Sequence, residues 1–276
     1  MIAITFPSTR NTENSSWEGH EDSVVSCAIF GRGRGQMVLS WSEDSTLRIW
    51  ELPQVWDDSS VAKAKCLRTF GEDTQGHDKA VRDCVVFDEG TQALSCSDDG
   101  SLRVWDLVAQ NCSNYGGKSI VMHGHNREKL VSCAILQSRD GWRALSGSAK
   151  GTLQVWDLVT GAELMLLRGH STEVRCLPLD GLRALTHSTD STRIWNLESR
   201  QRKCTLSKFR KHQEHSGMIS LGRRILAWHG CNIVTSDIQP IMDGGQWGVA
   251  SGPPTQNDGM VLCCAAFRAG GVPRSL

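Results

Sequence analysis

Short runs in which apolar and polar residues alternate dominate this chain, and no long stretch repeats apolar residues with helical spacing. Alternation with a period of two is typical of β-strands that bury one face. Such runs end in tryptophan at four places: LRIW (47–50), LRVW (102–105), LQVW (153–156) and TRIW (192–195). The pattern therefore predicts an all-β protein built from one repeated unit.

In each unit the same three strands accompany the strand that ends in tryptophan. An LS-x-S type strand precedes it, as in MVLSWS (37–42) and QALSCS (92–97). Another apolar strand lies before that one, as in VVSCAIF (24–30), and a fourth strand leads to the next unit, as in CLRTF (66–70). A Gly-His pair opens each unit, at Gly19-His20, Gly76-His77, Gly124-His125 and Gly169-His170.

In this combination of motifs the chain resembles the WD-repeat (Trp-Asp repeat) family over roughly residues 17–268. In three of the units the tryptophan is followed by an acid and a leucine, and Asn196-Leu197 follows it in the fourth. The resemblance implies a β-propeller of four-stranded antiparallel blades. We expect about five blades plus an incomplete sixth.

The resemblance also implies a buried tetrad in each blade, in which tryptophan, a hydroxyl residue, histidine and aspartate are hydrogen-bonded in series. Carried over onto this sequence, the tetrads are His20, Ser40, Asp44 and Trp50; His77, Ser95, Asp99 and Trp105; His125, Ser146 and Trp156; and His170, Thr186, Asp190 and Trp195. Lys150 stands where the third unit should have its aspartate, so we expect His125 to be held less firmly. A closed series of donors and acceptors satisfies dipoles that are costly to bury alone.

The units divide the chain into an N-terminal segment (1–16) with a possible closing strand at 2–6, four well-formed repeats (17–213), a degenerate fifth repeat (214–250) and a truncated sixth (251–276). The fifth keeps His215, but Ala227, Cys231 and Ser236 replace its tetrad partners. A ring needs a whole number of blades. Self-association, or sequence outside this chain, is therefore the expected route to closure.

Composition narrows the class of protein. Thirty basic residues balance thirty acidic ones, so no global field favours nucleic acid or anionic lipid. No apolar run is long enough to span a membrane, and the N-terminus lacks the pattern of a signal peptide. We expect a chain of the cytoplasm, or of the nucleus, with no membrane partner. Five of its eleven cysteines recur at one strand position, as small buried apolar residues do: Cys27, Cys84, Cys133, Cys264 and, allowing a one-residue slip, Cys176.

Candidate chemistry is sparse. Four copies of a His-Asp pair at fixed spacing indicate structure rather than catalysis, so we expect no enzyme, no catalytic residue and no cofactor. The His123/His125 and His212/His215 clusters lack further ligands, so no metal is expected either. A basic segment at 200–224 allows RNA binding as a less favoured alternative, because it lacks interleaved aromatic residues.

Protein recognition is the favoured function, through loops at one face of the propeller. The candidate partner-binding residues are Asp22, Ser23, Trp41, Glu43, Lys79, Asp98, Arg127, Glu128, Glu173, His187 and Trp228. Trp41 and Trp228 are expected to be exposed aromatic anchors. The chain is thus expected to be a non-catalytic scaffold or adaptor. The alternative is a sensor fragment of a larger signalling protein that also has a nucleotide-binding or protease domain.

Overall fold

The structure is a computed structural model of the chain. It describes residues 18–31, 36–52, 65–71, 76–108, 120–180 and 182–199, together with the backbone of strands within 201–208, 216–221, 224–229, 232–237 and 255–256. Within these residues the only helical elements are two single 3-10 turns, η1 (Asp88–Gly90) and η2 (His125–Arg127). No helix in the described ranges is long and apolar enough to cross a membrane.

The strands form five four-stranded antiparallel sheets, each built from strands that follow one another in the chain. Sheet 1 contains β1 (Val24–Phe30), β2 (Met37–Ser42), β3 (Leu47–Glu51) and β4 (Lys65–Phe70). Sheet 2 contains β5 (Val81–Phe87), β6 (Gln92–Ser97), β7 (Ser101–Asp106) and β8 (Ile120–His123). Sheet 3 contains β9 (Leu130–Ser138), β10 (Gly141–Ser148), β11 (Thr152–Asp157) and β12 (Glu163–Arg168).

Sheets 4 and 5 continue the series. Sheet 4 contains β13 (Arg175–Asp180), β14 (Arg183–His187), β15 (Ser191–Asn196) and β16 (Gln201–Lys208). Sheet 5 contains β17 (Ser216–Leu221), β18 (Arg224–His229), β19 (Asn232–Asp237) and β20 (Thr255–Gln256). The predicted all-β propeller of four-stranded antiparallel blades is confirmed by these sheets.

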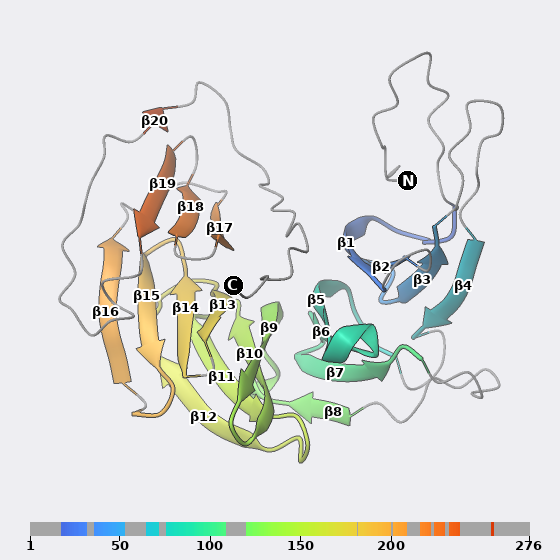
Figure 1. Ribbon diagram of the computed structural model, residues 1–276, viewed down its shortest axis with the longest axis horizontal. Coiled ribbons are helices and arrows are strands. Elements are labelled where there is room, and N and C mark those ends of the chain that lie inside the picture. The colour runs from blue at the N-terminus through green and yellow to red at the C-terminus, as the bar shows by residue number, and fades with distance from the viewer. Residues whose placement is uncertain are drawn as a thin grey trace, which may run out of the picture.

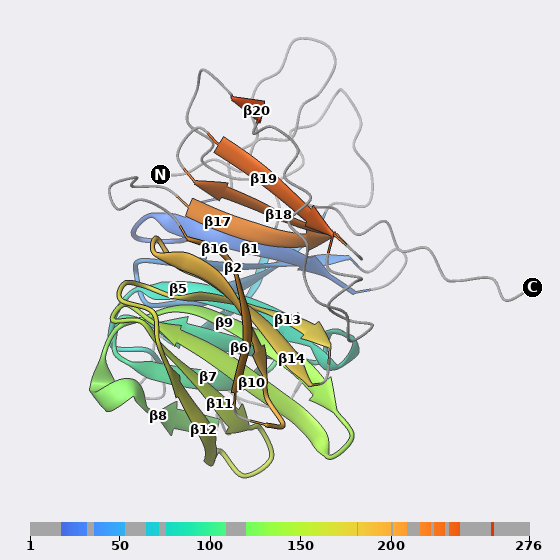
Figure 2. The same ribbon diagram turned by 90° about the vertical axis from the view of Figure 1, so that its left-hand side faces the viewer.

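The first strands of neighbouring sheets lie side by side. Contacts run from β1 to β5, from β5 to β9, from β9 to β13 and from β13 to β17. The sheets are therefore arranged around a common axis like blades, and Figure 1 shows the described strands as an arc with sheets 1 and 5 at its two ends. Figure 2 gives a side view of the same strands, with sheet 5 at the top and β8, β11 and β12 at the bottom.

β1 is more exposed than the first strands of sheets 2, 3 and 4. Cys27 on β1 is exposed, whereas Cys84, Cys133 and Cys176 at the equivalent position are buried. The expected closing strand at residues 2–6 and the apolar strand expected at 261–267 lie outside the described residues. Closure of the ring therefore stays a prediction.

The hydrophobic core consists of layers between sheets. One layer joins the β2 and β3 side chains of sheet 1 to Val81, Ala93 and Trp105 of sheet 2. The same arrangement joins sheet 2 to sheet 3 and sheet 3 to sheet 4. Each central strand thus turns alternate residues toward the preceding and the following sheet, which is the reason for the period of two in the sequence.

The first four units that open with a Gly-His pair coincide with the sheets. β4 ends at Phe70, before the Gly76-His77 pair, and it is the outer strand of sheet 1. β20 pairs with β19, however, so the fifth sheet extends into the range assigned to the sixth repeat. Phe70 packs against Trp105 with ring centroids 5.5 Å apart, which ties the outer strand of sheet 1 to sheet 2.

Candidate functional site

The polar side chains expected to form tetrads meet inside the sheets. In sheet 1, Trp50 Nε1 donates to Ser40 Oγ at 2.8 Å, and Ser40 Oγ lies 2.7 Å from His20 Nε2. His20 Nδ1 lies 2.7 Å from Asp44 Oδ2. A carboxylate only accepts, so Nδ1 carries the histidine proton and Nε2 accepts the serine hydroxyl. The structure thus brings together all four residues of the first unit.

Sheets 2 and 4 repeat this arrangement. His77 contacts Ser95 and Asp99 at 2.7 and 2.9 Å, and Trp105 donates to Ser95 at 2.8 Å. In sheet 4 the equivalent distances are 2.8 Å from His170 to Thr186, 2.7 Å from His170 to Asp190 and 2.7 Å from Trp195 to Thr186. The shorter Asp190-to-Trp195 spacing therefore does not prevent the contact.

Sheet 3 closes its tetrad with a different group. His125 Nε2 lies 2.7 Å from Ser146 Oγ, and Trp156 donates to the same oxygen at 2.8 Å. His125 Nδ1 lies 2.6 Å from Thr152 Oγ1 in place of a carboxylate. Thr152 Oγ1 in turn lies 2.8 Å from Ser148 Oγ. The imidazole is therefore fully bonded, although Lys150 replaces the aspartate.

The missing aspartate changes the loop after the histidine. In sheets 1, 2 and 4 the aspartate also accepts the backbone N–H of the residue that follows the histidine, for example Glu21 to Asp44 Oδ2 at 2.9 Å. Without that acceptor the third unit folds into a turn in which Arg127 N donates to Gly124 O at 2.8 Å. His125, Asn126 and Arg127 have φ of 50°, 54° and 60°. Three successive left-handed residues without glycine are a strained backbone.

The glycine before each histidine makes room for the tryptophan ring. A Cβ added at Gly19 would lie 2.7 Å from the Cη2 atom of Trp50, and one at Gly124 would overlap the ring of Trp156. The Gly-His motif is therefore a steric requirement of the tetrad rather than a separate site.

Burial lowers the pKa of the tetrad histidines below 6.5. The effect is large for His125, whose pKa burial lowers to about 4 because no carboxylate bonds its ring. Burial of Asp99 opposes its ionisation, but hydrogen bonds from His77 and Ser101 outweigh this and hold its pKa well below the usual range. The tetrad histidines are thus neutral at pH 7 and committed to structural bonds.

Two candidate partner residues were misplaced by the sequence prediction. Trp41 is only 5% exposed and packs in the layer between sheets 1 and 2, so it is not an exposed anchor. His187 is 1% exposed and its Nδ1 lies 2.9 Å from Thr192 Oγ1. Strand alternation does turn both away from the tetrad hydroxyl, but both are buried on that side, and Trp41 faces sheet 2 and not solvent. The side chain of Trp228 lies outside the described residues.

Asp98 is a third candidate that is buried. Its carboxylate is bonded by Arg82 at 2.8 and 3.0 Å and by Lys129 Nζ at 3.0 Å. Arg82 also lies 2.7 Å from Glu43 Oε1. This chain of ion pairs connects Glu43 of sheet 1, Arg82 and Asp98 of sheet 2, and Lys129 beside sheet 3.

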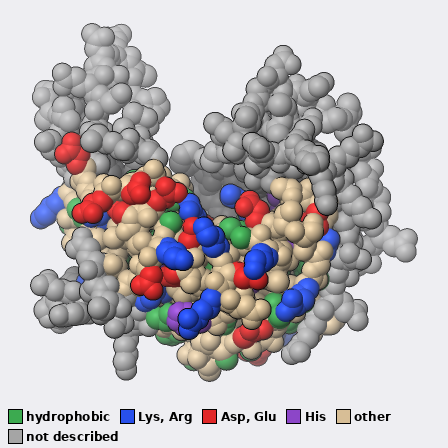
Figure 3. Space-filling view, turned by 180° about the vertical axis from the view of Figure 1, so that it is seen from behind, with side chains coloured by type: hydrophobic (Ala, Val, Ile, Leu, Met, Phe, Trp, Pro, Cys, Tyr) green, Lys and Arg blue, Asp and Glu red, His purple; other side chains and the backbone are tan. Residues whose placement is uncertain are grey.

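The other candidates gather at one end of the sheets. The loop before each first strand is joined to the turn after the second strand by backbone bonds, such as Glu43 N to Ser23 O at 2.9 Å. Asp22, Lys79, Arg127 and Glu173 are exposed there, while Ser23, Glu43 and Glu128 are half-buried. Figure 3 shows acidic and basic side chains interspersed on one face of the molecule rather than segregated by sign.

The sequence prediction missed a hydroxyl that supports every tetrad. Thr46, Ser101 and Ser191 donate to the tetrad aspartate of their sheet at 2.7 to 3.0 Å, and Thr152 bonds the histidine itself. The signal was present, since a serine or threonine stands one or two residues after each aspartate or after Lys150. Arg82 and Lys129 were missed as well, because their partners belong to other strands.

The fifth unit keeps the strand pairing of the other units but lacks the side chains that form a tetrad. β18 and β19 pair Ala227 with Val234 and Ile225 with Ser236, just as β2 and β3 pair Ser40 with Arg48 and Val38 with Trp50. Ala227 and Ser236 thus occupy the tetrad positions on the backbone, while His215 and Cys231 lie outside the described residues. Within the described residues no cluster of histidine, cysteine and carboxylate side chains could hold a metal ion.

The sequence of this chain matches that of a known protein family. The family model described as "WD domain, G-beta repeat" matches residues 11–51, 64–106 and 116–157. Nuclear distribution protein PAC1 of Arthroderma otae is 28% identical over 215 residues, covering 67% of this chain and 42% of that protein. Apoptotic protease-activating factor 1 of Rattus norvegicus is 27% identical over 190 residues, covering 68% of this chain and 13% of that protein.

Two further similarities cover other lengths. Pre-mRNA-processing factor 17 of Homo sapiens is 35% identical over 96 residues, which is 35% of this chain and 14% of that protein. The crystal structure of the computationally designed Ika8 protein matches the fold with a TM-score of 0.60 at 23% identity, covering 81% of this chain and 61% of that one. The chain spans less than half the length of these curated relatives.

Proposed function

Because the chain belongs to the WD40 repeat family, we propose that it is a non-catalytic scaffold or adaptor, which binds protein partners through the end of the sheets that carries Asp22, Lys79 and Glu173. The fold alone does not dictate this function. The proposal therefore rests on the chemistry of that surface.

One observation supports the proposal most strongly: some charged side chains are bonded to other residues of the protein, whereas others at the same end are exposed and make no ion pair with a described residue. Inside the sheets the histidines and aspartates are bonded to one another, and at the rim Asp98 is held by Arg82 and Lys129. Asp22, Lys79, Arg127 and Glu173 are exposed at the same end, and none of them makes an ion pair with another described residue. Charges of both signs on a rigid support suit a protein surface of complementary charge.

The test compares charge reversal at the two ends of the sheets. The intact chain and its D22K/E173K variant are used to capture partners from a cell extract, which are identified by mass spectrometry. The D140K/E198K variant, with two exposed acids reversed at the opposite end, is the matched control. We expect the control to retain the partners and D22K/E173K to lose them. Equal capture by both variants, or no specific capture by the intact chain, would refute the proposal.

A second candidate is a sensor region of a larger signalling protein that also has a nucleotide-binding or protease domain. It is favoured by one finding, the similarity to a short part of apoptotic protease-activating factor 1. Sequencing the full transcript tests it: an open reading frame that continues into such a domain supports this candidate, and a frame confined to the repeats refutes it.

RNA binding through residues 200–224 is less favoured. The side chains of this segment lie outside the described residues, and similarity to pre-mRNA-processing factor 17 concerns only 96 residues. Electrophoretic shifts with RNA at several salt concentrations test it, because phosphate contacts weaken steeply with salt. For the adaptor we propose a place in the cytoplasm, with the nucleus as the alternative.

A further inference from the structure

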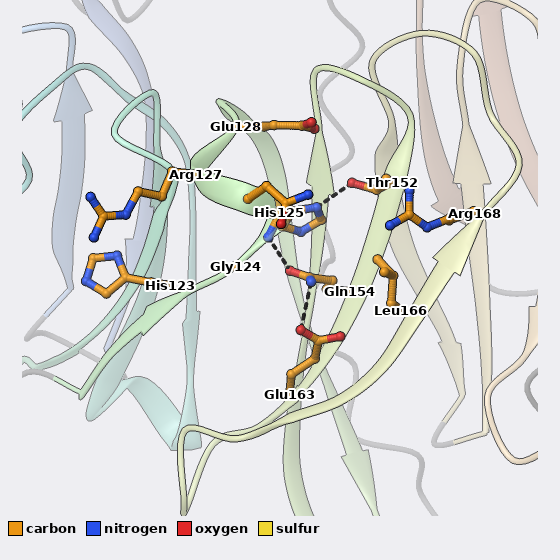
Figure 4. Close-up of a pocket in the computed structure, with 11 residues that line it drawn as sticks. His123, Gly124, His125, Arg127, Glu128, Thr152, Gln154, Glu163, Leu166 and Arg168 are labelled. Atoms are coloured by element: carbon orange, nitrogen blue, oxygen red, sulfur yellow. Dashed lines mark hydrogen bonds between the residues drawn. The ribbon is translucent and has the colours of Figure 1, made fainter.

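A polar pocket opens beside the one tetrad that lacks its aspartate. Its volume is about 380 Å³, and it lies between η2, which follows sheet 2, and strands β11 and β12 of sheet 3. Figure 4 shows His125, Thr152 and Gln154 at its centre, with Arg127 and His123 on one side and Arg168 on the other. This volume is within the range of pockets that bind small chemical groups.

The pocket exists because a residue is shorter here than in the other units. Gln154 stands where Arg48, Arg103 and Arg193 stand in sheets 1, 2 and 4. In sheet 4 the Arg193 guanidinium fills this place and donates to Asp190 at 3.4 Å and to Ser191 at 2.9 Å. Gln154 instead bonds to two neighbouring residues. Its Oε1 accepts the backbone N–H of His125 at 2.9 Å, and its Nε2 donates to Glu163 Oε2 at 2.9 Å.

Two departures from the repeat therefore act together. Lys150 removes the carboxylate, and Gln154 removes the arginine that would have paired with it. The freed loop adopts the left-handed turn that brings Arg127 to the pocket. Strained turns of this kind persist where the surroundings hold them, and they are common at binding sites.

Two guanidinium groups and one carboxylate around the pocket lack an ion pair with a described residue, so positive charge is in excess. Glu128 is paired with Lys150 Nζ at 3.2 Å, whereas Glu163 only accepts a hydrogen bond from the neutral Gln154 amide. Arg127 and Arg168 make no ion pair with any described residue, and both are exposed. Guanidinium groups bind carboxylate and phosphate oxygens in a bidentate manner.

We propose that this pocket binds a compact oxyanion, either a carboxylate or a phosphate group, carried by a side chain of a partner protein. Arg168 binds the oxygens from one side. The exposed Arg127 side chain, which points away from Arg168 in Figure 4, turns inward to bind them from the other side, and the exposed His123 adds a further donor. For the identity of its partner the inference rests on the proposed function, whereas the pocket itself is tested with small probes.

The test uses NMR titration of the intact chain, following the backbone amide of Asn126 and the Nε–H signals of the arginines. The probes are inorganic phosphate and two blocked tripeptides whose central residue is glutamate or phosphoserine. We expect saturable shifts that weaken by about tenfold in both R127Q and R168Q, since each removes charge-assisted bonds. R139Q, which changes an exposed arginine at the other end of the β9–β10 hairpin, should bind like the wild type.

A pattern-restoring variant completes the test. K150D/Q154R gives sheet 3 the aspartate and arginine of the other sheets, so it should fold normally and lose probe binding. Tighter binding of the phosphoserine peptide assigns the site to phosphorylated partners, and tighter binding of the glutamate peptide assigns it to acidic ones. Shifts that do not saturate with any probe, or that are equal in wild type, R127Q and R168Q, overturn the proposal.

The two proposals fail separately. If the intact chain captures no protein partner while the probes bind in the manner that depends on Arg127 and Arg168, the adaptor function is wrong and the pocket remains. If D22K/E173K loses its partners but binds the probes unchanged, the pocket is independent of that surface.

Discussion

Lys150 Nζ lies 3.2 Å from Glu128 Oε1, although Lys150 occupies the position from which an aspartate bonds the tetrad histidine in sheets 1, 2 and 4. The lysine is 74% exposed at its side chain. Exposed ion pairs stabilise a fold only slightly. The third sheet thus depends for its histidine on Thr152, and the lysine points outward to a partner of its own.

Restoring the repeat pattern in sheet 3 should stabilise it cooperatively. K150D alone loses the Glu128 ion pair and places two carboxylates near each other, so we expect little gain. K150D/Q154R adds the arginine that pairs with such an aspartate, as Arg193 does with Asp190. A double-mutant cycle by thermal unfolding should give a favourable coupling of about 0.5–1 kcal/mol. Additive effects would show that the two departures are unrelated.

Removing a tetrad residue should lower stability without affecting any chemistry. His77 has a fully buried side chain, and H77A removes the acceptor of the Ser95 hydroxyl and one of the donors to Asp99. The expected cost is about 1–3 kcal/mol, seen as a fall of several degrees in Tm. H123A, which changes an exposed histidine, is the control and should leave Tm unchanged. An equal fall in both variants would contradict the structural role.

Trp41 should be needed for folding rather than for partner binding. It is buried between sheets 1 and 2, so W41A leaves a cavity that costs about 3–5 kcal/mol. W41F should cost less, because it keeps most of the apolar volume. Calorimetric unfolding of both variants measures this. A W41A protein that melts like the wild type but loses its partners would restore Trp41 as a contact residue.

Acidification from pH 7 to pH 5 should lower the Tm. Burial lowers the pKa of His20, His77, His125 and His170. The unfolded chain therefore binds more protons than the native state below about pH 6.5, and stability falls with pH. Asp83 acts in the opposite sense, because burial raises its pKa to about 6 and its stabilising contribution is lost as the pH rises through that value. We expect the loss of stability from the four histidines to exceed the gain from this one carboxyl group.

The opposing contribution of Asp83 can be isolated. D83N removes the group that gains stability on acidification, so the fall in Tm between pH 7 and pH 5 should be steeper in D83N than in the wild type. A shallower fall in D83N, or a wild-type Tm that rises on acidification, would show that the sign of these pKa shifts is wrong.

Ser45 offers a stabilising substitution. It lies in the turn between β2 and β3 with φ of 72°, where the second and third units have Gly100 and Gly151 with φ of 81° and 91°. S45G removes the strain of a side chain in this conformation, at some entropic cost, so we expect a gain of a few tenths to about 1 kcal/mol. The reverse change G100A should lower Tm, and a gain from G100A would contradict this reading.

The sequence predicted the architecture well because the same strand pattern occurs four times, so that each copy supports the assignment of strands in the others. It also placed Trp41 and His187 correctly on the side of the strand opposite the tetrad. It failed on what that side faces, because a sequence shows the alternation of a strand but not whether a neighbouring sheet covers it. The pocket was likewise beyond prediction, since it arises from a loop that rearranges when Lys150 replaces an aspartate two strands away.

The family-model match at residues 64–106 is offset by one strand from the sheets, and this offset bears on how such chains change during evolution. Loss of residues 64–106 would remove β4 together with β5, β6 and β7. β8 would then follow β3 in the chain and supply the missing outer strand of sheet 1. An unequal recombination between two units thus deletes or duplicates a whole blade and leaves no orphan strand behind. The number of blades is free to drift by single steps while every surviving sheet stays intact.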